Sequence, residues 1–231
     1  DTLQRLNSTQ RQAEADARAL QLALAQQTAT AEVLQVISSS TADAQPVLEQ
    51  ILRSCSHLVH AQSMAINLIG EDGRLHLAAS LVIGLDGQPG FTQPELEAAL
   101  DQVLSVYPMA LEGTGTALVI ASGRVLNFPD VLNGTDVPAG VRAPAQALRL
   151  NYSQMMAPLM QGERGIGSIV MQRVALGGFT DREQALLKTF ADQAVIAIQN
   201  AKMFREKQEA PEQQTATAEI LKVIAASPSD V

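Results

Sequence analysis

The stretch NYSQMMAPLMQGERGIGSIVMQR, residues 151–173, decides the fold class because it describes two strands joined by a tight turn. Residues 152–160 and 166–173 are short, largely apolar runs. Between them stands Gly162-Glu163-Arg164-Gly165, and glycine supplies the backbone freedom that a tight reversal requires. The stretch therefore predicts an antiparallel β-hairpin.

A further hairpin is expected upstream. Residues 63–69 alternate in character and end at Gly70-Glu71-Asp72-Gly73, which is typical of a turn. Residues 74–80 then return as the paired strand, and residues 125–127 could add a short one. The strands are thus expected to form an antiparallel sheet.

Helical patterns flank these strands. After Pro46, one apolar stripe is formed by Val47, Leu48, Ile51, Leu52, Cys55, Leu58 and Val59. A second helix is expected from Pro94 to Val106, and a long one after Thr180-Asp181, with Glu183 in its first turn. Pro211 should kink or restart that last helix because proline removes one helical hydrogen bond. Together with the strands, this pattern predicts an α+β domain.

Residues 128–150 are the candidate binding segment. They contain three prolines and few periodic apolar positions, and predict a loop with a short helix over residues 144–150. Long irregular segments in compact domains are usually lids or binding loops. Arg142 is a candidate anion clamp and Tyr152 a candidate polar contact; two solvated carboxylates and one solvated arginine are the alternative. The candidate ligand residues are Phe128, Asp130, Asp136, Arg142, Tyr152 and Met155.

The N-terminal residues follow a seven-residue pattern from Leu3 to Leu34, which predicts a dimeric coiled coil. A single amphipathic helix that lies on its own domain is the alternative. Residues 187–204 also alternate spacings of three and four. The predicted homodimer contacts are Leu3, Leu6, Ala13, Ala17, Leu20, Leu24, Phe190, Ala194, Ala197, Ala201 and Phe204.

The segment QQTATAEVLQVISSSTAD at residues 26–43 recurs as QQTATAEILKVIAASPSD at residues 213–230, with 12 of 18 positions identical. A repeat at this offset predicts one complete unit followed by the start of another. We therefore expect an N-terminal helix over residues 1–43, a domain over 44–205, and a linker helix over 206–231. Because the chain begins with Asp1, we expect it to be a fragment of a longer protein.

Composition restricts the classes of function. The net charge of −8 argues against a nucleic-acid surface, and no apolar run has the ~20 residues of a membrane span. The single Cys55 fits a reducing, cytoplasmic compartment, and its spacing from His57 and His60 does not suit a metal site. Gly113-Thr114-Gly115 lacks the third glycine of a phosphate-binding loop. No catalytic constellation has credible spacing, so we expect no enzyme, no metal and no evident cofactor.

Four stretches resemble successive pieces of a GAF domain over residues 44–205. They are GRLHLAAS from Gly73, LVIASGRVLNFPDV from Leu118, the residues 151–173 quoted above, and FTDREQALLKTFADQAVIAIQNAKMFRE from Phe179. The flanking repeat resembles linkers of bacterial signalling proteins that place several GAF units before a histidine kinase or cyclase output.

The resemblance implies a central antiparallel sheet of about six strands with helices on both faces. It also implies that the first and last helices carry a dimer contact, and that loops on the other face enclose a small-molecule pocket. The implied function is a sensory module that relays ligand binding to an adjacent GAF or output domain. The alternative is a ligand-free spacer in which methionines fill the pocket.

Overall fold

The computed structural model describes residues 44–83, 98, 101–102 and 104–226. Its centre is one antiparallel sheet of six strands in the order β3-β2-β1-β6-β5-β4. The strands are β1 (Ser63–Ile69), β2 (Arg74–Val82), β3 (Met109–Ala110), β4 (Leu126–Phe128), β5 (Ser153–Gln161) and β6 (Arg164–Arg173). Both predicted hairpins are confirmed: β1 pairs with β2, and β5 pairs with β6.

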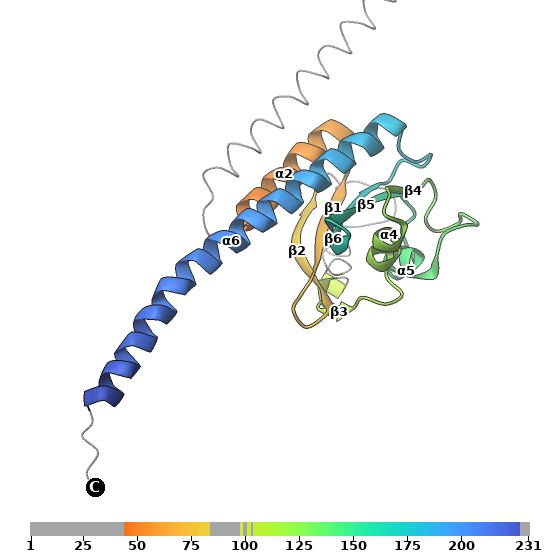
Figure 1. Cartoon of the computed structure of the whole chain (residues 1–231). Helices are drawn as coiled ribbons and strands as arrows, with labels where there is room; N and C mark the ends of the chain where they lie inside the picture. Colours follow the sequence, from red (N-terminus) through yellow and green to blue (C-terminus); the bar gives the residue numbers. More distant parts are fainter. Residues whose placement is uncertain (1–43, 84–97, 99–100, 103, 227–231) are drawn as a thin grey trace, which may run out of the picture.

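One face of the sheet is covered by α2 (Gln45–Val59) and α6 (Asp181–Ala226), which lie side by side in Figure 1. The apolar stripe of α2 turns inward, so that Ile51, Leu52 and Cys55 are fully buried. They pack with Phe190 of α6 and with alternate side chains of the central strands. The main core therefore lies between these two helices and the sheet.

The other face carries α4 (Gly115–Ser122) and α5 (Ala139–Leu148) (Figure 1). Thr114 caps α4 by accepting a hydrogen bond from the backbone N–H of Ala117, and Gly123 ends it with a φ of 63°. A smaller core joins the two helices to β5 and β6 through buried residues such as Val119, Val141 and Met156. The α+β class, with helices on both faces of a six-stranded sheet, is confirmed.

Two helical predictions need correction. The short helix expected over residues 144–150 is α5, which begins five residues earlier at Ala139 and contains Pro144. Pro138 supplies the extended residue before it, so Pro144 lies inside the helix rather than at its start. The long helix α6 does not restart at Pro211 but is continuous from Asp181 to Ala226. A proline removes one N–H donor, and the rest of a long helix can persist around it.

Several predictions fall on residues outside the described ranges. They concern the heptad segment at residues 1–43, most of the helix expected over 94–106, and the last residues of the C-terminal repeat. Within the described part of the chain, no helix combines the length and the apolar character needed to cross a membrane.

Candidate ligand pocket

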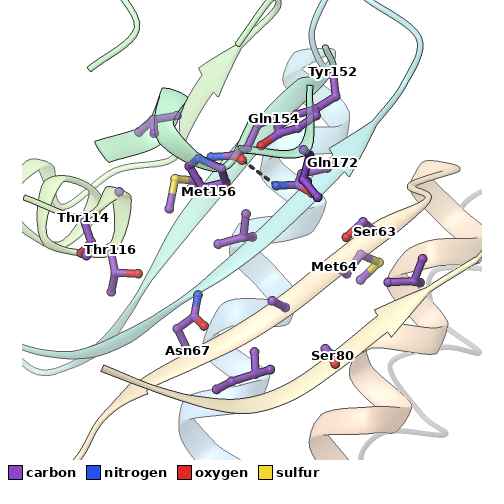
Figure 2. Close-up of a pocket in the computed structure, with 18 of the residues that line it drawn as sticks. Ser63, Met64, Asn67, Ser80, Thr114, Thr116, Tyr152, Gln154, Met156 and Gln172 are labelled. Carbon is purple, nitrogen blue, oxygen red and sulfur yellow. Dashed lines mark hydrogen bonds between the residues drawn. The ribbon is translucent and has the colours of Figure 1, made fainter. Parts of the chain in front are cut away.

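A pocket lies on the face of the sheet that α4 and α5 cover. Its volume is about 230 Å³, the equivalent of several water molecules at ~30 Å³ each. The strands β2, β1, β6 and β5 form its floor, and residues of α4, α5 and the segment before β3 complete its walls. Figure 2 shows polar side chains from separate elements lining the space.

Along β5, side chains point alternately into this pocket and into the main core. Tyr152, Gln154 and Met156 line the pocket, whereas Met155 between them is fully buried in the core against α2 and α6. Successive side chains of a strand point to opposite faces of its sheet. On β5 the pocket floor is therefore built from every second residue.

Cross-strand register arranges the floor in three rows. The first row is Ser63–Gln172–Gln154, the second is Ala65–Val170–Met156, and the third is Asn67–Ser168–Pro158. The first row is largely polar, and in the third row Asn67 lines the pocket whereas Ser168 and Pro158 do not. The middle row is apolar on β1, β6 and β5, and Ser80 of β2, the partner of Ala65, adds a hydroxyl beside it. Because Ser63 and Asn67 are four residues apart on β1, the outer rows are separated by about 13 Å.

Polar side chains at the two ends of the floor form some of their hydrogen bonds with neighbouring polar side chains. Gln172 Nε2 donates a hydrogen bond of 2.9 Å to Gln154 Oε1, drawn as a dashed line in Figure 2. At the other end, the hydroxyls of Thr116 and Ser168 lie 2.8 Å apart in a buried hydrogen bond. The hydrogen bond between Gln154 and Gln172 holds these two side chains together across β5 and β6. The hydrogen bond between Thr116 and Ser168 joins α4 to β6.

Two buried polar atoms of the lining have no partner among the described residues. They are Asn67 Oδ1 and the hydroxyl of Tyr152, in side chains only 5% and 2% exposed. Burial raises the pKa of Tyr152, and also that of Tyr107, so both phenols stay neutral near pH 7. An unpaired buried polar atom costs stability in a folded protein. Both atoms are covered by neighbouring side chains, so a bound molecule pairs with them only if it displaces part of that cover.

Arg173 is the charged residue in the described lining, and its charge is engaged elsewhere. Its guanidinium lies 2.8 Å from Glu183 Oε1, donates to the carbonyl of Gly178, and stacks 4.2 Å from the ring centroid of Phe179. The described lining contains no Asp, Glu, Lys, His or Cys. The described part of the lining thus presents hydrogen-bonding groups and apolar surface but no free charge.

Of the six predicted ligand residues, Tyr152 lines the pocket and the other five lie outside its lining. Arg142 Nη2 donates to the carbonyl oxygens of Gly134 at 2.6 Å and Val137 at 3.2 Å. Its guanidinium therefore holds the loop before α5 instead of facing the cavity.

The remaining candidates also have local roles. Asp130 Oδ1 accepts hydrogen bonds from the backbone N–H of Asn133 and from Asn151 Nδ2, which together hold its pKa below the ordinary value. Asp136 is exposed, and Phe128 packs against the smaller core. Asp130 and Arg142 thus stabilise the segment that precedes α5.

Four polar residues of the lining are not among the predicted ligand residues: Asn67, Thr116, Gln154 and Gln172. Parity along the strands was the available signal, because Gln154 shares a face with Tyr152 whereas Met155 cannot. The pairing of β1 with β6, which brings Asn67 close to the pocket helices, depends on register between distant segments and has no local signature.

The residues of α6 predicted for a dimer contact are largely buried within the chain. Phe190, Ala194, Ala197 and Ala201 are between 0% and 3% exposed, and Phe204 is partly exposed. The open face of α6 instead carries Ile196 and Met203, at 43% and 59% exposure. Leu3, Leu6, Ala13, Ala17, Leu20 and Leu24 lie outside the described residues.

No group of three His, Cys, Asp or Glu side chains in the described part of the chain is placed to hold a metal ion. Cys55 is fully buried in the main core, and desolvation raises the pKa of its thiol. His57 and His60 are exposed on the other side of α2 and its end. Cys55 is therefore a core residue, as its place on the apolar stripe predicts.

Comparisons with solved structures identify the same fold in several proteins. The GAF domain of a phosphoenolpyruvate-protein phosphotransferase from Coxiella burnetii has a TM-score of 0.58 at 14% identity, covering 78% of this chain and 96% of that one. A free methionine-R-sulfoxide reductase from Neisseria meningitidis, in complex with its substrate, has a TM-score of 0.55 at 16% identity, covering 79% and 93%. A protein in a far-red absorbing dark state with bound biliverdin IXa has a TM-score of 0.51 at 16% identity, covering 75% and 99%.

No curated protein matches the sequence. The profile of the GAF domain, however, matches residues 43–198, which is more than half of the chain and includes the whole six-stranded sheet. The chain therefore belongs to the GAF domain family.

Proposed function

We propose that this chain is a sensory GAF module that binds a small molecule in the pocket and relays its presence through α6. The observation that carries the proposal is the pair of buried, unpartnered polar atoms, Asn67 Oδ1 and the Tyr152 hydroxyl, in the pocket lining. A fold that kept them only for packing would be more stable with apolar side chains there. A ligand that pairs with them would explain their presence.

The contacts of Arg173 support a route from pocket to helix. Arg173 lines the pocket at the end of β6, and its guanidinium contacts Glu183 in the first turn of α6. Asn127 of β4 strengthens this junction, because its amide donates to the carbonyl of Phe179 at 2.8 Å and accepts from its N–H at 3.1 Å. A ligand that moves the end of β6 would therefore shift the start of α6.

Two structures of the same fold support the general idea of ligand binding, since one holds biliverdin IXa and the other its substrate. This chain has no catalytic group in the described lining that would favour chemistry over binding. Within the proposal, the module is non-catalytic, acts in the cytoplasm, and passes its signal to an adjacent GAF or output domain, of histidine kinase or cyclase type. A homodimer joined through the N-terminal heptads would carry the signal in paired helices.

A thermal-shift screen of metabolites against the 231-residue chain tests the proposal. A ligand is expected to raise Tm, and hydrogen exchange should then slow in β1, β5 and β6 and change in the first turns of α6. Ala65→Phe fills the middle row of the pocket and should abolish the shift while the chain stays folded. If no metabolite raises Tm, and if Ala65→Phe is more stable than the parent, the chain is a ligand-free spacer instead.

The positions of the methionines give less reason to expect a ligand-free spacer with a filled pocket. Met155 and Met171 are fully buried in the main core, on the other face of the sheet, and cannot fill the pocket. Met109 and Met156 line the pocket and leave the cavity open.

A further inference from the structure

We propose that the ligand is a neutral, elongated molecule with an apolar middle and a hydrogen-bonding group at each end. This inference rests on the proposed function and adds the chemical class of the ligand. It follows from three properties of the pocket: its lack of free charge, the order of its three rows, and the positions of its unpartnered polar atoms.

The absence of free charge in the described lining is the first step. A charged group that leaves water for a buried site costs much free energy unless an opposite charge receives it. Arg173, the charged residue of the described lining, is already paired with Glu183 and stacked on Phe179. Arg142 of α5 is bound to two backbone carbonyls outside the lining. Among the described lining residues, neither a carboxylate or phosphate nor an ammonium group finds a free counter-charge.

The second step is the order of the rows. A ligand that lies across the floor would meet the polar row of Ser63, Gln172 and Gln154, then Ala65, Val170 and Met156, then Asn67. The outer rows are about 13 Å apart, which matches a molecule of two linked rings with polar ends. The volume of about 230 Å³ suits a ligand of this size.

The chemistry of the ligand's two ends follows from the polar side chains at each end of the pocket. Asn67 Oδ1 is an acceptor without a partner, so the ligand group beside it must carry an N–H or O–H. At the other end are the unpartnered hydroxyl of Tyr152 and the Gln154–Gln172 pair. In that pair Gln154 Nε2 and Gln172 Oε1 are not used by the hydrogen bond that joins the two side chains. Figure 2 shows Asn67 and Tyr152 on opposite sides of the pocket.

The chain provides its own reporter for this site. It contains two tyrosines, Tyr107 and Tyr152, and both line the pocket. Ring-labelled tyrosine therefore gives NMR signals from the pocket alone. Three probes with one skeleton vary only in charge: 4′-hydroxybiphenyl-4-carboxamide is neutral, the matching carboxylate is an anion, and the matching amidine is a cation.

The carboxamide is expected to shift the tyrosine signals and to bind at least about tenfold more tightly than either charged probe, since each would enter the pocket without a counter-charge. Asn67→Asp places a carboxylate beside the probe's nitrogen and should move the preference toward the amidine. Asn67→Leu should weaken carboxamide binding and raise the Tm of the ligand-free chain, because it removes an unpaired buried oxygen.

Gln193→Met is the matched control. Gln193 Oε1 is also buried and unpartnered, but it lies on α6 outside the pocket lining, so the carboxamide affinity should not change. The inference is overturned if the carboxylate or the amidine binds as tightly as the carboxamide, or if the carboxamide at ~1 mM leaves both tyrosine signals unchanged. Tight binding of a charged probe would leave the sensory proposal standing, whereas the sensory proposal itself is overturned if no metabolite raises Tm and Ala65→Phe is more stable than the parent.

Discussion

At the scale of single residues, Gly140 sets how closely α5 approaches the loop before α4. A Cβ atom at Gly140 would lie 1.7 Å from the carbonyl oxygen of Gly113, a backbone atom that cannot rotate away. We expect Gly140→Ala to lower the free energy of unfolding by about 3 kcal/mol or more, because α5 must shift away from its support. Urea denaturation measures the change.

Gly162→Ala is the control for that experiment. Gly162 has a φ of 63° in the β5–β6 turn, and nothing lies within 4 Å of a Cβ built there. The substitution should lower the free energy of unfolding by only ~1–2 kcal/mol, the cost of a left-handed backbone at a residue with a Cβ atom. If the two substitutions cost the same, the close contact between Gly140 and Gly113 is not real.

Arg142 is a second residue whose role the structure defines. Because its guanidinium donates to the carbonyls of Gly134 and Val137, Arg142→Ala should lower the free energy of unfolding by about 1–3 kcal/mol, the usual range for a hydrogen bond to a charged group. Arg124→Ala is the control, since Arg124 is exposed and its side chain has no hydrogen bond in the described structure. A stability loss no larger than that of Arg124→Ala would contradict this role.

At the scale of the elements, the hairpins could be predicted because their signals are local. Residues 63–69 and 74–80 became β1 and most of β2, and the turn glycines lie where the strands reverse. The helix α4 gave no such signal, since its sequence GTALVIAS is apolar on nearly every side and has no helical period. Its cap at Thr114 is clear only once the helix is known.

The candidate site was harder to predict because it depends on how elements meet. Arg142 was a reasonable anion clamp by residue type, yet its position in α5 directs it to its own loop. The burial of Phe190 and Ala194 shows a similar limit. A spacing of three and four residues describes any buried helix face, whether the partner is the same chain or a second copy.

The first turn of α6 yields a prediction about pH. Burial raises the pKa of Glu183, but hydrogen bonds from the backbone and hydroxyl of Thr180 and from Arg173 outweigh it, so the pKa is lowered overall. A carboxylate with a lowered folded-state pKa stabilises the fold above its unfolded value of 4.5, and this contribution is lost as the pH falls below that value. Stability should therefore drop on acidification.

Glu183→Gln isolates this contribution. The variant should be less stable than the parent at pH 7, and the difference should shrink as the pH falls below about 4.5. Glu163→Gln is the control, because Glu163 is exposed in the β5–β6 turn and the described structure gives it no ion pair. Thermal unfolding of all three proteins across that pH range measures the effect. A stability difference for Glu183→Gln that does not depend on pH would contradict the assignment.

At the scale of the whole molecule, the two faces of the sheet have different tasks. One face is a dry core against α2 and α6, with Ile51, Leu52 and Phe190 almost completely buried. The other holds a cavity between strands and short helices. Rigid packing on the first face would transmit a change from the second to α6, which extends far beyond the sheet in Figure 1. That extension leads toward the second copy of the repeated segment at residues 213–230.

The last prediction concerns how two copies meet. The proposed homodimer must use the N-terminal heptads and the open face of α6, since Phe190, Ala194 and Ala197 are occupied within the chain. Leu20→Asp in the heptads and Ile196→Asp on the open face should each raise the dimer dissociation constant by about tenfold or more, because a charge would enter an apolar contact. Sedimentation velocity measures the dissociation constant, and thermal unfolding reports the fold.

Phe190→Asp separates the two faces of α6 in the same experiment. This side chain is 1% exposed in the main core, so its replacement should unfold the domain, whereas Ile196→Asp, at a position 43% exposed, should leave the sheet domain folded. A parent chain that sediments as a monomer at tens of micromolar would refute the dimer. An Ile196→Asp variant that dimerises as tightly as the parent would confine the contact to the heptads, and the signal would then have to pass between copies without the open face of α6.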